Sequence, residues 1–152
     1  KGELVHIPLP PDAPDVIISN CVTNLSADKD AVLREAFRVL KPGGRLAVSD
    51  VVVTAEVPAA IRKSMELWLG CIAGALRDRD YIDKLARAGF EGIQIEPTRV
   101  YDIEDARQFL DGHGIDVDAI AGQVAGKFMS AFIRAVKPSG ESCCAPACCR
   151  ST

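Results

Sequence analysis

Two apolar runs that flank one amphipathic segment limit the fold of this chain more than any other feature. The runs are "DVIIS" at 15–19 and "RLAVSDVVV" at 45–53. Each is continuous, as is typical of strands buried on both faces. The segment between them places its apolar side chains on one face of a helix: Val32, Leu33, Ala36, Phe37 and Leu40. This strand–helix–strand order predicts a βαβ unit with two neighbouring parallel strands in an α/β fold.

The ends of the first predicted helix are marked by polar residues and by glycine. Ser26 precedes the helix and is expected to cap it, and Asp28 and Asp30 suit its positive amino-terminal end. Pro42-Gly43-Gly44 is a stop signal that separates the helix from the second strand. We assign this glycine pair only that structural role.

The remaining pattern predicts further elements of an α/β domain. We expect helices at 58–75 and 79–90, the latter ended by Gly89, strands at 91–98 and 127–137, and helix with loops over 102–122. Residues 1–138 are expected to form one partial domain, and 139–152, which has little to bury, a flexible tail rich in cysteine.

Composition excludes several classes of protein. The chain has 152 residues, 48% of them apolar, which is enough for the core of one domain. The net charge of -3 does not favour binding to nucleic acid or to an anionic membrane. No apolar run approaches the roughly 18 residues that span a bilayer. Because the chain starts with Lys1 and opens in mid-pattern, we expect it to be a fragment of a longer protein.

The cysteines do not have the distribution of a disulfide scaffold. Two are isolated in the body of the chain, and four crowd the tail as "CCAPACC": Cys143, Cys144, Cys148 and Cys149. This pattern favours a cytoplasmic protein with reactive or metal-binding thiols. Cys21 directly follows the first predicted strand, and Cys71 lies in the segment after the second.

The stretch "REAFRVLKPGGRLAVSD" (34–50) resembles the helix, turn and strand that follow the cofactor site in class I S-adenosylmethionine-dependent methyltransferases. The resemblance implies the later half of a Rossmann-like class I methyltransferase fold, with the last strand antiparallel. It also implies S-adenosylmethionine as cofactor, with Glu3 and Leu4 beside the adenine and Asn20 near the methionine part. Ligands of open α/β sheets do bind at the carboxyl ends of the strands.

A narrower resemblance rests on "ISNCVTNLSADKDAVLREAFRVLKPGG" together with "LWLGCIAGAL". Both cysteine contexts are similar to those of the arsenite methyltransferases, which serve arsenic detoxification. The resemblance implies that Cys21 and Cys71 are catalytic and hold trivalent arsenic, for which thiolates are natural ligands. The arsenic lone pair would then attack the sulfonium methyl. The implied partners are arsenite or its thiol conjugates and a thiol reductant, thioredoxin or glutathione.

The chain departs from that family in its amino-terminal part. The glycine-rich loop that cradles the methionine end of the cofactor is missing, and so is the acid that takes the ribose hydroxyls. We therefore expect this polypeptide to be inactive alone. Two other functions stay open: a non-catalytic thiol protein that only binds metalloid, and a class I methyltransferase for a small organic substrate. An organic acceptor, however, needs no thiols.

Simpler interpretations of single residues also remain. Cys21 could be a small buried apolar residue, which is a common role for cysteine. The four tail thiols could capture arsenic or another soft metal ion, or have no function. Asp50, at the end of its strand, is expected to be a solvated loop acid, and Trp68 to pack in the core or in a lid.

Overall fold

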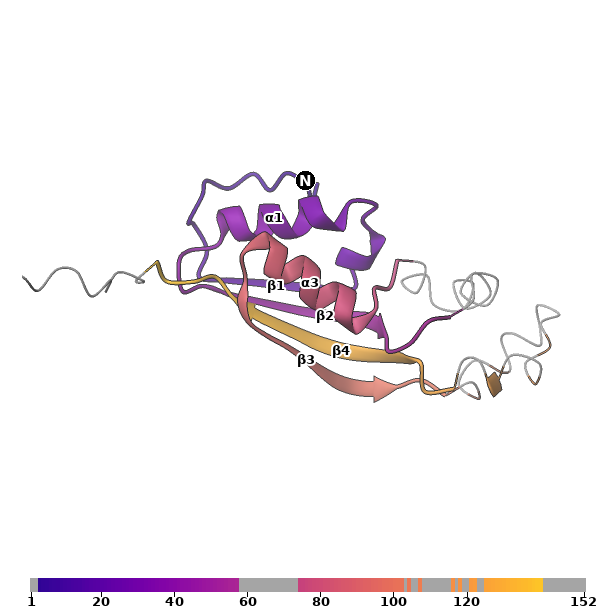
Figure 1. The fold of residues 1–152 in the computed structure, drawn as a ribbon. Coiled ribbons are helices and arrows are strands. Elements are labelled where there is room, and N and C mark those ends of the chain that lie inside the picture. Colours follow the sequence, from indigo (N-terminus) through magenta and orange to yellow (C-terminus); the bar gives the residue numbers. More distant parts are fainter. Residues whose placement is uncertain are drawn as a thin grey trace, which may run out of the picture.

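The computed structural model describes residues 3–57, 74–102 and 125–140, together with residues 104, 107, 116, 118, 121 and 122. The named elements, shown in Figure 1, follow in chain order: β1 (Val16–Asn20), the 3-10 helix η1 (Thr23–Leu25), α1 (Lys29–Val39), β2 (Arg45–Val53), α3 (Asp78–Ala88), β3 (Glu91–Val100) and β4 (Phe128–Val136).

The strands form one mixed sheet in the order β1-β2-β4-β3. β1 and β2 are parallel neighbours, in register from Val16 opposite Arg45 to Asn20 opposite Ser49. β4 runs antiparallel to both β2 and β3. The predicted βαβ unit and the antiparallel last strand are therefore confirmed.

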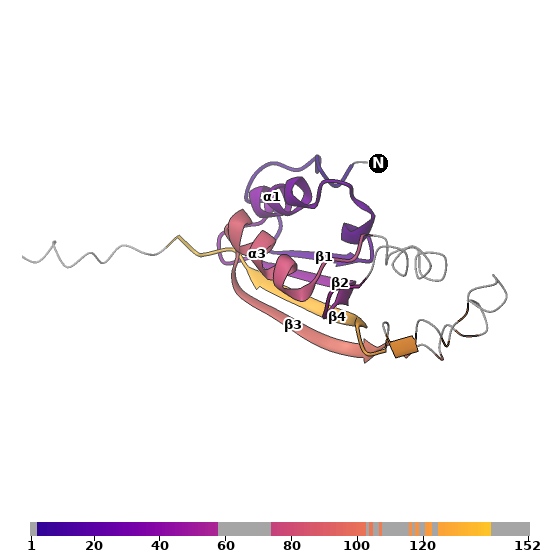
Figure 2. The ribbon, with the colours of Figure 1, turned by 45° about the vertical axis from the view of Figure 1, so that its right-hand side comes forward.

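Both described helices lie on the same side of the sheet, as Figures 1 and 2 show from two directions. The core forms between them and one face of the strands. Its largest fully buried members are Leu33 and Leu40 from α1 and its cap, Tyr81 and Leu85 from α3, and Val48, Val52 and Ile133 from the sheet. The apolar stripes of α1 and α3 thus bury against alternate residues of β2 and β4.

One expectation about β1 is wrong. The run at 15–19 was predicted to be buried on both faces, yet Ile18 is 80% exposed and Val16 is 39% exposed. β1 is the edge strand of the described sheet, and the described helices cover only its other face, where Ile17 packs against the core. In β2, which has a neighbour on each side, Val51, Val52 and Val53 are all buried.

The helix ends confirm one prediction and correct another. Gly89 ends α3 with φ at 102°, a conformation that glycine adopts without cost. The cap of α1 is Asp28 rather than Ser26, because the Asp28 carboxylate accepts the Ala31 N–H at 2.8 Å. Ser26 instead donates from its hydroxyl to the Asp28 carbonyl at 3.2 Å.

Other expectations lie outside the described residues. They are the helix at 58–75 up to its last two positions, most of the helix and loops at 102–122, the packing of Trp68, the position of Cys71 and the tail from 141 onward. In the part of the chain that the structure describes, no helix is long and apolar enough to cross a membrane.

Candidate functional site

Cys21 occupies a strained backbone conformation where β1 ends. Its φ is +54°, in the left-handed region, which costs a residue with a side chain about 1–2 kcal/mol. The conformation is held from β2, because the Cys21 N–H donates to the Ser49 carbonyl at 2.8 Å. Such strain persists where surrounding contacts determine the backbone, and it is often found at functional sites. The thiol is partly buried at the carboxyl edge of the sheet.

The turn after Cys21 is fastened to the end of β2. Thr23 and Asn24 are both 3% exposed. The Asn24 side-chain amide donates to the Val51 carbonyl at 2.8 Å. Lys29 Nζ donates to the Asn24 carbonyl at 3.3 Å and to the Ser26 carbonyl at 2.9 Å. The backbone that carries Cys21 is therefore held by β2 and by the first turn of α1.

A buried acid lies beside this turn. Asp50 is 1% exposed, so its expected role as a solvated loop acid is wrong. Burial raises the pKa of Asp50 to about 6, although the N–H groups of Val51 and Asn24 and the charge of Lys29 oppose the shift. Burial also raises the pKa of Tyr81, and the Asp50 charge adds to that effect.

Asp50, Asn24 and Tyr81 form a buried polar cluster. Among the described side chains, three buried polar atoms have no hydrogen-bond partner: Asn24 Oδ1, Asp50 Oδ2 and the Tyr81 hydroxyl. The sequence-based reasoning missed this cluster. The available signal was a single acid within the otherwise apolar end of a strand. The cluster places a carboxyl with a raised pKa, about 6, next to the turn that follows Cys21.

The residues expected to contact a cofactor occupy two places. Asn20 is exposed at the last position of β1. Glu3 and Leu4 lie in a turn in which the Glu3 carbonyl accepts the His6 N–H at 2.9 Å. The loop that continues this turn is anchored to α1: Glu35 Oε1 accepts the Ile7 N–H at 2.8 Å, and Arg38 Nη2 donates to the Leu9 carbonyl at 3.0 Å.

The predicted arsenic site is only partly described. Cys71 and the four tail cysteines lie outside the described residues, so their positions relative to Cys21 stay predictions. Among the described residues, no group of three or more His, Cys, Asp or Glu side chains could hold a metal ion.

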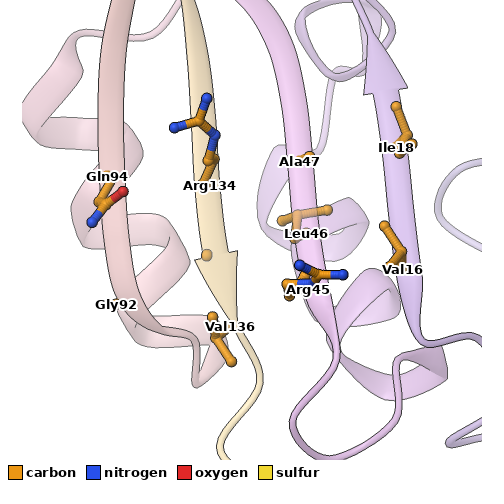
Figure 3. Close-up of a pocket in the computed structure, with 10 residues that line it drawn as sticks. Val16, Ile18, Arg45, Leu46, Ala47, Gly92, Gln94, Arg134 and Val136 are labelled. Carbon is orange, nitrogen blue, oxygen red and sulfur yellow. The ribbon is translucent and has the colours of Figure 1, made fainter.

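A separate cavity lies on the sheet face opposite the helices, and Figure 3 shows its lining. Its volume is about 570 Å³. Val16 and Ile18 of β1, Ala47 of β2 and Val136 of β4 supply apolar lining, and Arg45 and Arg134 supply charge. Val16 and Arg45 are the first residues of β1 and β2, so the cavity extends toward the end of the strands away from Cys21. It is not part of the site at the carboxyl edge.

Comparison with known proteins identifies the family. Residues 1–114 match the family described as "Methyltransferase domain". The chain belongs to this methyltransferase family. Its mixed sheet and helices are those of a Rossmann-like class I methyltransferase, as the sequence predicted.

The narrower resemblance is confirmed by relatives. An arsenite methyltransferase of Halobacterium salinarum is 37% identical over 141 residues, which is 92% of this chain and 33% of that protein. One from Aquipseudomonas alcaligenes is 40% identical over 104 residues, 68% of this chain and 30% of that protein.

A solved structure shows the same relationship. The crystal structure of CrArsM, an arsenic(III) S-adenosylmethionine methyltransferase from Chlamydomonas reinhardtii, is 34% identical with a TM-score of 0.68. The match covers 91% of this chain and 44% of that chain. The matched segment is about a third of the length of each of these two arsenite methyltransferases.

Proposed function

We propose that the protein to which this chain belongs transfers a methyl group from S-adenosylmethionine to trivalent arsenic held by thiolates. The observation that carries the proposal is Cys21, strained and held by β2 at the carboxyl edge of a methyltransferase sheet. The two arsenite methyltransferases that match this chain over most of its length support the choice of substrate. A soft thiolate is the natural protein ligand for arsenic(III).

In this proposal the described residues contact one side of the cofactor. The exposed Asn20, at the carboxyl end of β1, would contact the cofactor at this edge of the sheet. The contact of Glu3 and Leu4 with the adenine rests on the family resemblance. The chain has no glycine-rich loop to hold the methionine end. When bound, S-adenosylmethionine would supply a methyl group on a positively charged sulfur, open to attack by a lone pair. We therefore expect this chain alone to bind the cofactor weakly and to be inactive.

In this proposal the role of the chain is to position arsenic rather than to transfer protons. Cys21 and Cys71 would hold arsenic through two sulfur atoms and leave its lone pair available. The product must be returned to the trivalent, thiol-bound state before another turnover, so a thiol reductant such as thioredoxin or glutathione is expected. The tail cysteines would capture arsenic without placing it for reaction.

The test uses a chimera in which this chain replaces the matched segment of the Halobacterium salinarum relative. Cys21→Ser and Cys71→Ser should each lower arsenite methylation at least 100-fold, because a neutral hydroxyl replaces a soft thiolate. Replacement of all four tail cysteines by Ser should change the rate less than threefold. Methylation by Cys21→Ser near the wild-type rate, or methylation of an organic acceptor alone, would refute the proposal.

Cys21→Gly is the matched control for folding. Glycine adopts the left-handed conformation freely, so this variant should be more stable than wild type by about 1 kcal/mol and yet should not methylate arsenite. Urea unfolding of the chain and a methylation assay of the chimera measure the two effects. Destabilisation of Cys21→Gly would contradict the strain assigned to this position.

A further inference from the structure

Three consecutive residues of β2 contact the turn that carries Cys21. The Ser49 carbonyl accepts the Cys21 N–H at 2.8 Å, and the Val51 carbonyl accepts the Asn24 side-chain amide at 2.8 Å. Asp50, the residue between them, is 1% exposed, and its carboxyl interacts with the Asn24 N–H. Asp50 therefore adds a side-chain contact to the two contacts that the backbone of β2 makes with this turn.

The cluster around the Asp50 carboxyl is short of hydrogen-bond donors. Asp50 Oδ1 accepts the Val51 N–H at 3.2 Å. In the part of the chain that the structure describes, Asp50 Oδ2, Asn24 Oδ1 and the Tyr81 hydroxyl are buried without a partner. The Tyr81 hydroxyl can donate to only one of the other two oxygens, so an ionised Asp50 leaves one of them without a donor. A protonated Asp50 donates from its own O–H and removes this deficit.

Among the described residues, two titratable side chains act on Asp50 or respond to it. The charge of Lys29, from α1, lowers the pKa of Asp50, and the same ammonium donates to the Asn24 carbonyl at 3.3 Å. Burial and then the Asp50 charge raise the pKa of Tyr81, from α3, so its hydroxyl keeps its proton. The 3-10 helix η1 contains no titratable side chain. Burial outweighs Lys29 and raises the pKa of Asp50 to about 6, so the charge of the cluster changes through Asp50.

We propose that Asp50 is a positioning residue for Cys21, whose buried side chain holds residues 21–24 against β2. This inference rests on the proposed function, because it concerns how the thiol offered to arsenic is held. When the carboxyl loses its proton, the cluster loses a donor and gains a buried charge, and both changes weaken the packing of Asn24 against β2. The strained backbone at Cys21, which depends on these neighbours, then opens more often.

The test measures alkylation of Cys21 by iodoacetamide in the 152-residue chain, with Cys71 and the four tail cysteines replaced by Ser. The same chain with Asp50→Asn is the comparison, because asparagine keeps an acceptor and a donor at every pH. The rate with Asp50 divided by the rate with Asp50→Asn should be about 1 at pH 5.0 and at least 3 at pH 7.5, because the opened turn exposes the thiol. A purely electrostatic effect of the carboxylate would instead slow alkylation, since a nearby negative charge disfavours the thiolate.

Asp83→Asn, at an exposed position of α3, is the matched control and should give a ratio of about 1 throughout. If a substituted chain fails to fold, amide exchange in the wild-type chain decides the question. The protection factor of the Cys21 N–H should then fall about tenfold between pH 5.0 and 7.5, because pH 5.0 lies about one unit below the pKa of Asp50.

An alkylation ratio that stays constant or falls as pH rises overturns this inference, as does a constant protection factor where exchange decides. Either result leaves the proposed function standing, because arsenic binding by Cys21 does not require Asp50 to titrate. Arsenite methylation at the wild-type rate by the Cys21→Ser chimera refutes the proposed function and leaves the coupling of Asp50 to Cys21 standing.

Discussion

The chemical properties of Cys21 and Asp50 are set by residues remote from them in sequence. Cys21 is held in the left-handed region through Ser49, on the neighbouring strand. Asp50 is buried beside Tyr81 of α3 and Asn24 of η1, so it keeps its proton to a higher pH than an exposed acid. At the scale of single residues, the site thus combines a strained backbone at Cys21 with a carboxyl whose pKa burial raises to about 6.

Asp50 should make stability depend on pH. Its pKa of about 6 in the folded state lies above the unfolded value of about 3.9, so the folded chain binds more protons between these values. The contribution of Asp50 to stability therefore falls as pH rises from about 4 to about 6. Asp50→Asn should be more stable than wild type at pH 7.5, by up to about 3 kcal/mol, and should lose this advantage near pH 4.

Urea unfolding at pH 4.0, 5.0, 6.0 and 7.5 measures this effect of Asp50→Asn. Asp83→Asn, at an exposed position of α3, is the control. A stability difference between Asp50→Asn and wild type that does not change with pH would show that the Asp50 carboxyl does not titrate in this range.

At the scale of elements, the start of α1 determines where the turn that carries Cys21 ends. The helix begins at Lys29 because the Asp28 carboxylate accepts the Ala31 N–H, which would otherwise lack an acceptor within the helix. Lys29, its first residue, then reaches back to the carbonyls of Asn24 and Ser26. A shift of the helix start by one residue would move this ammonium off the turn.

Two alanine variants separate the observed cap from the one expected from the sequence. Asp28→Ala should lower the free energy of unfolding by about 1 kcal/mol, because it removes the cap and a favourable charge at the positive end of the helix. Ser26→Ala should cost less than about 0.5 kcal/mol, because the serine hydroxyl donates to an exposed carbonyl, that of Asp28. Urea midpoints of the two variants decide between the caps, and a larger loss for Ser26→Ala would contradict the observed one.

At the scale of the whole molecule, Lys137 joins the end of β4 to the end of α1. Its ammonium donates to the Phe37 carbonyl at 2.9 Å and the Leu40 carbonyl at 2.7 Å, and to Asp12 Oδ1 at 2.8 Å. It also lies 4.8 Å from the centre of the Phe37 ring. These contacts place a positive charge at the negative end of α1 and connect the last strand of the described sheet to its first helix.

Lys137→Met should therefore destabilise the whole domain rather than one end of it. The substitution keeps most of the apolar stem and removes the charged hydrogen bonds, with an expected loss of about 2 kcal/mol. Lys127→Met is the control, since among the described residues the Lys127 ammonium donates only one long bond in an exposed setting, to the Glu56 carbonyl at 3.4 Å. Equal urea midpoints for the two variants would show that Lys137 does not couple β4 to α1.

The sequence by itself determined which segments form which elements. Apolar periodicity located α1 and α3, the continuous runs located β1 and β2, and Gly89 marked a helix end. These features are local, because the period of apolar residues and the conformational freedom of glycine act within a few residues. The parallel pairing of β1 with β2 followed from the order of the elements, and the antiparallel β4 from the resemblance to a family.

Only the tertiary structure decided the environment of individual side chains. The strand run at 15–19 looks buried in sequence, yet Ile18 is exposed because both described α-helices lie on the other face of the sheet. Asp50 looks like a surface acid, yet η1 and α3 bury it. The left-handed conformation of Cys21 depends on its contact with Ser49 of β2. Burial and backbone strain depend on contacts with residues that are distant in sequence. The local sequence pattern does not specify these contacts.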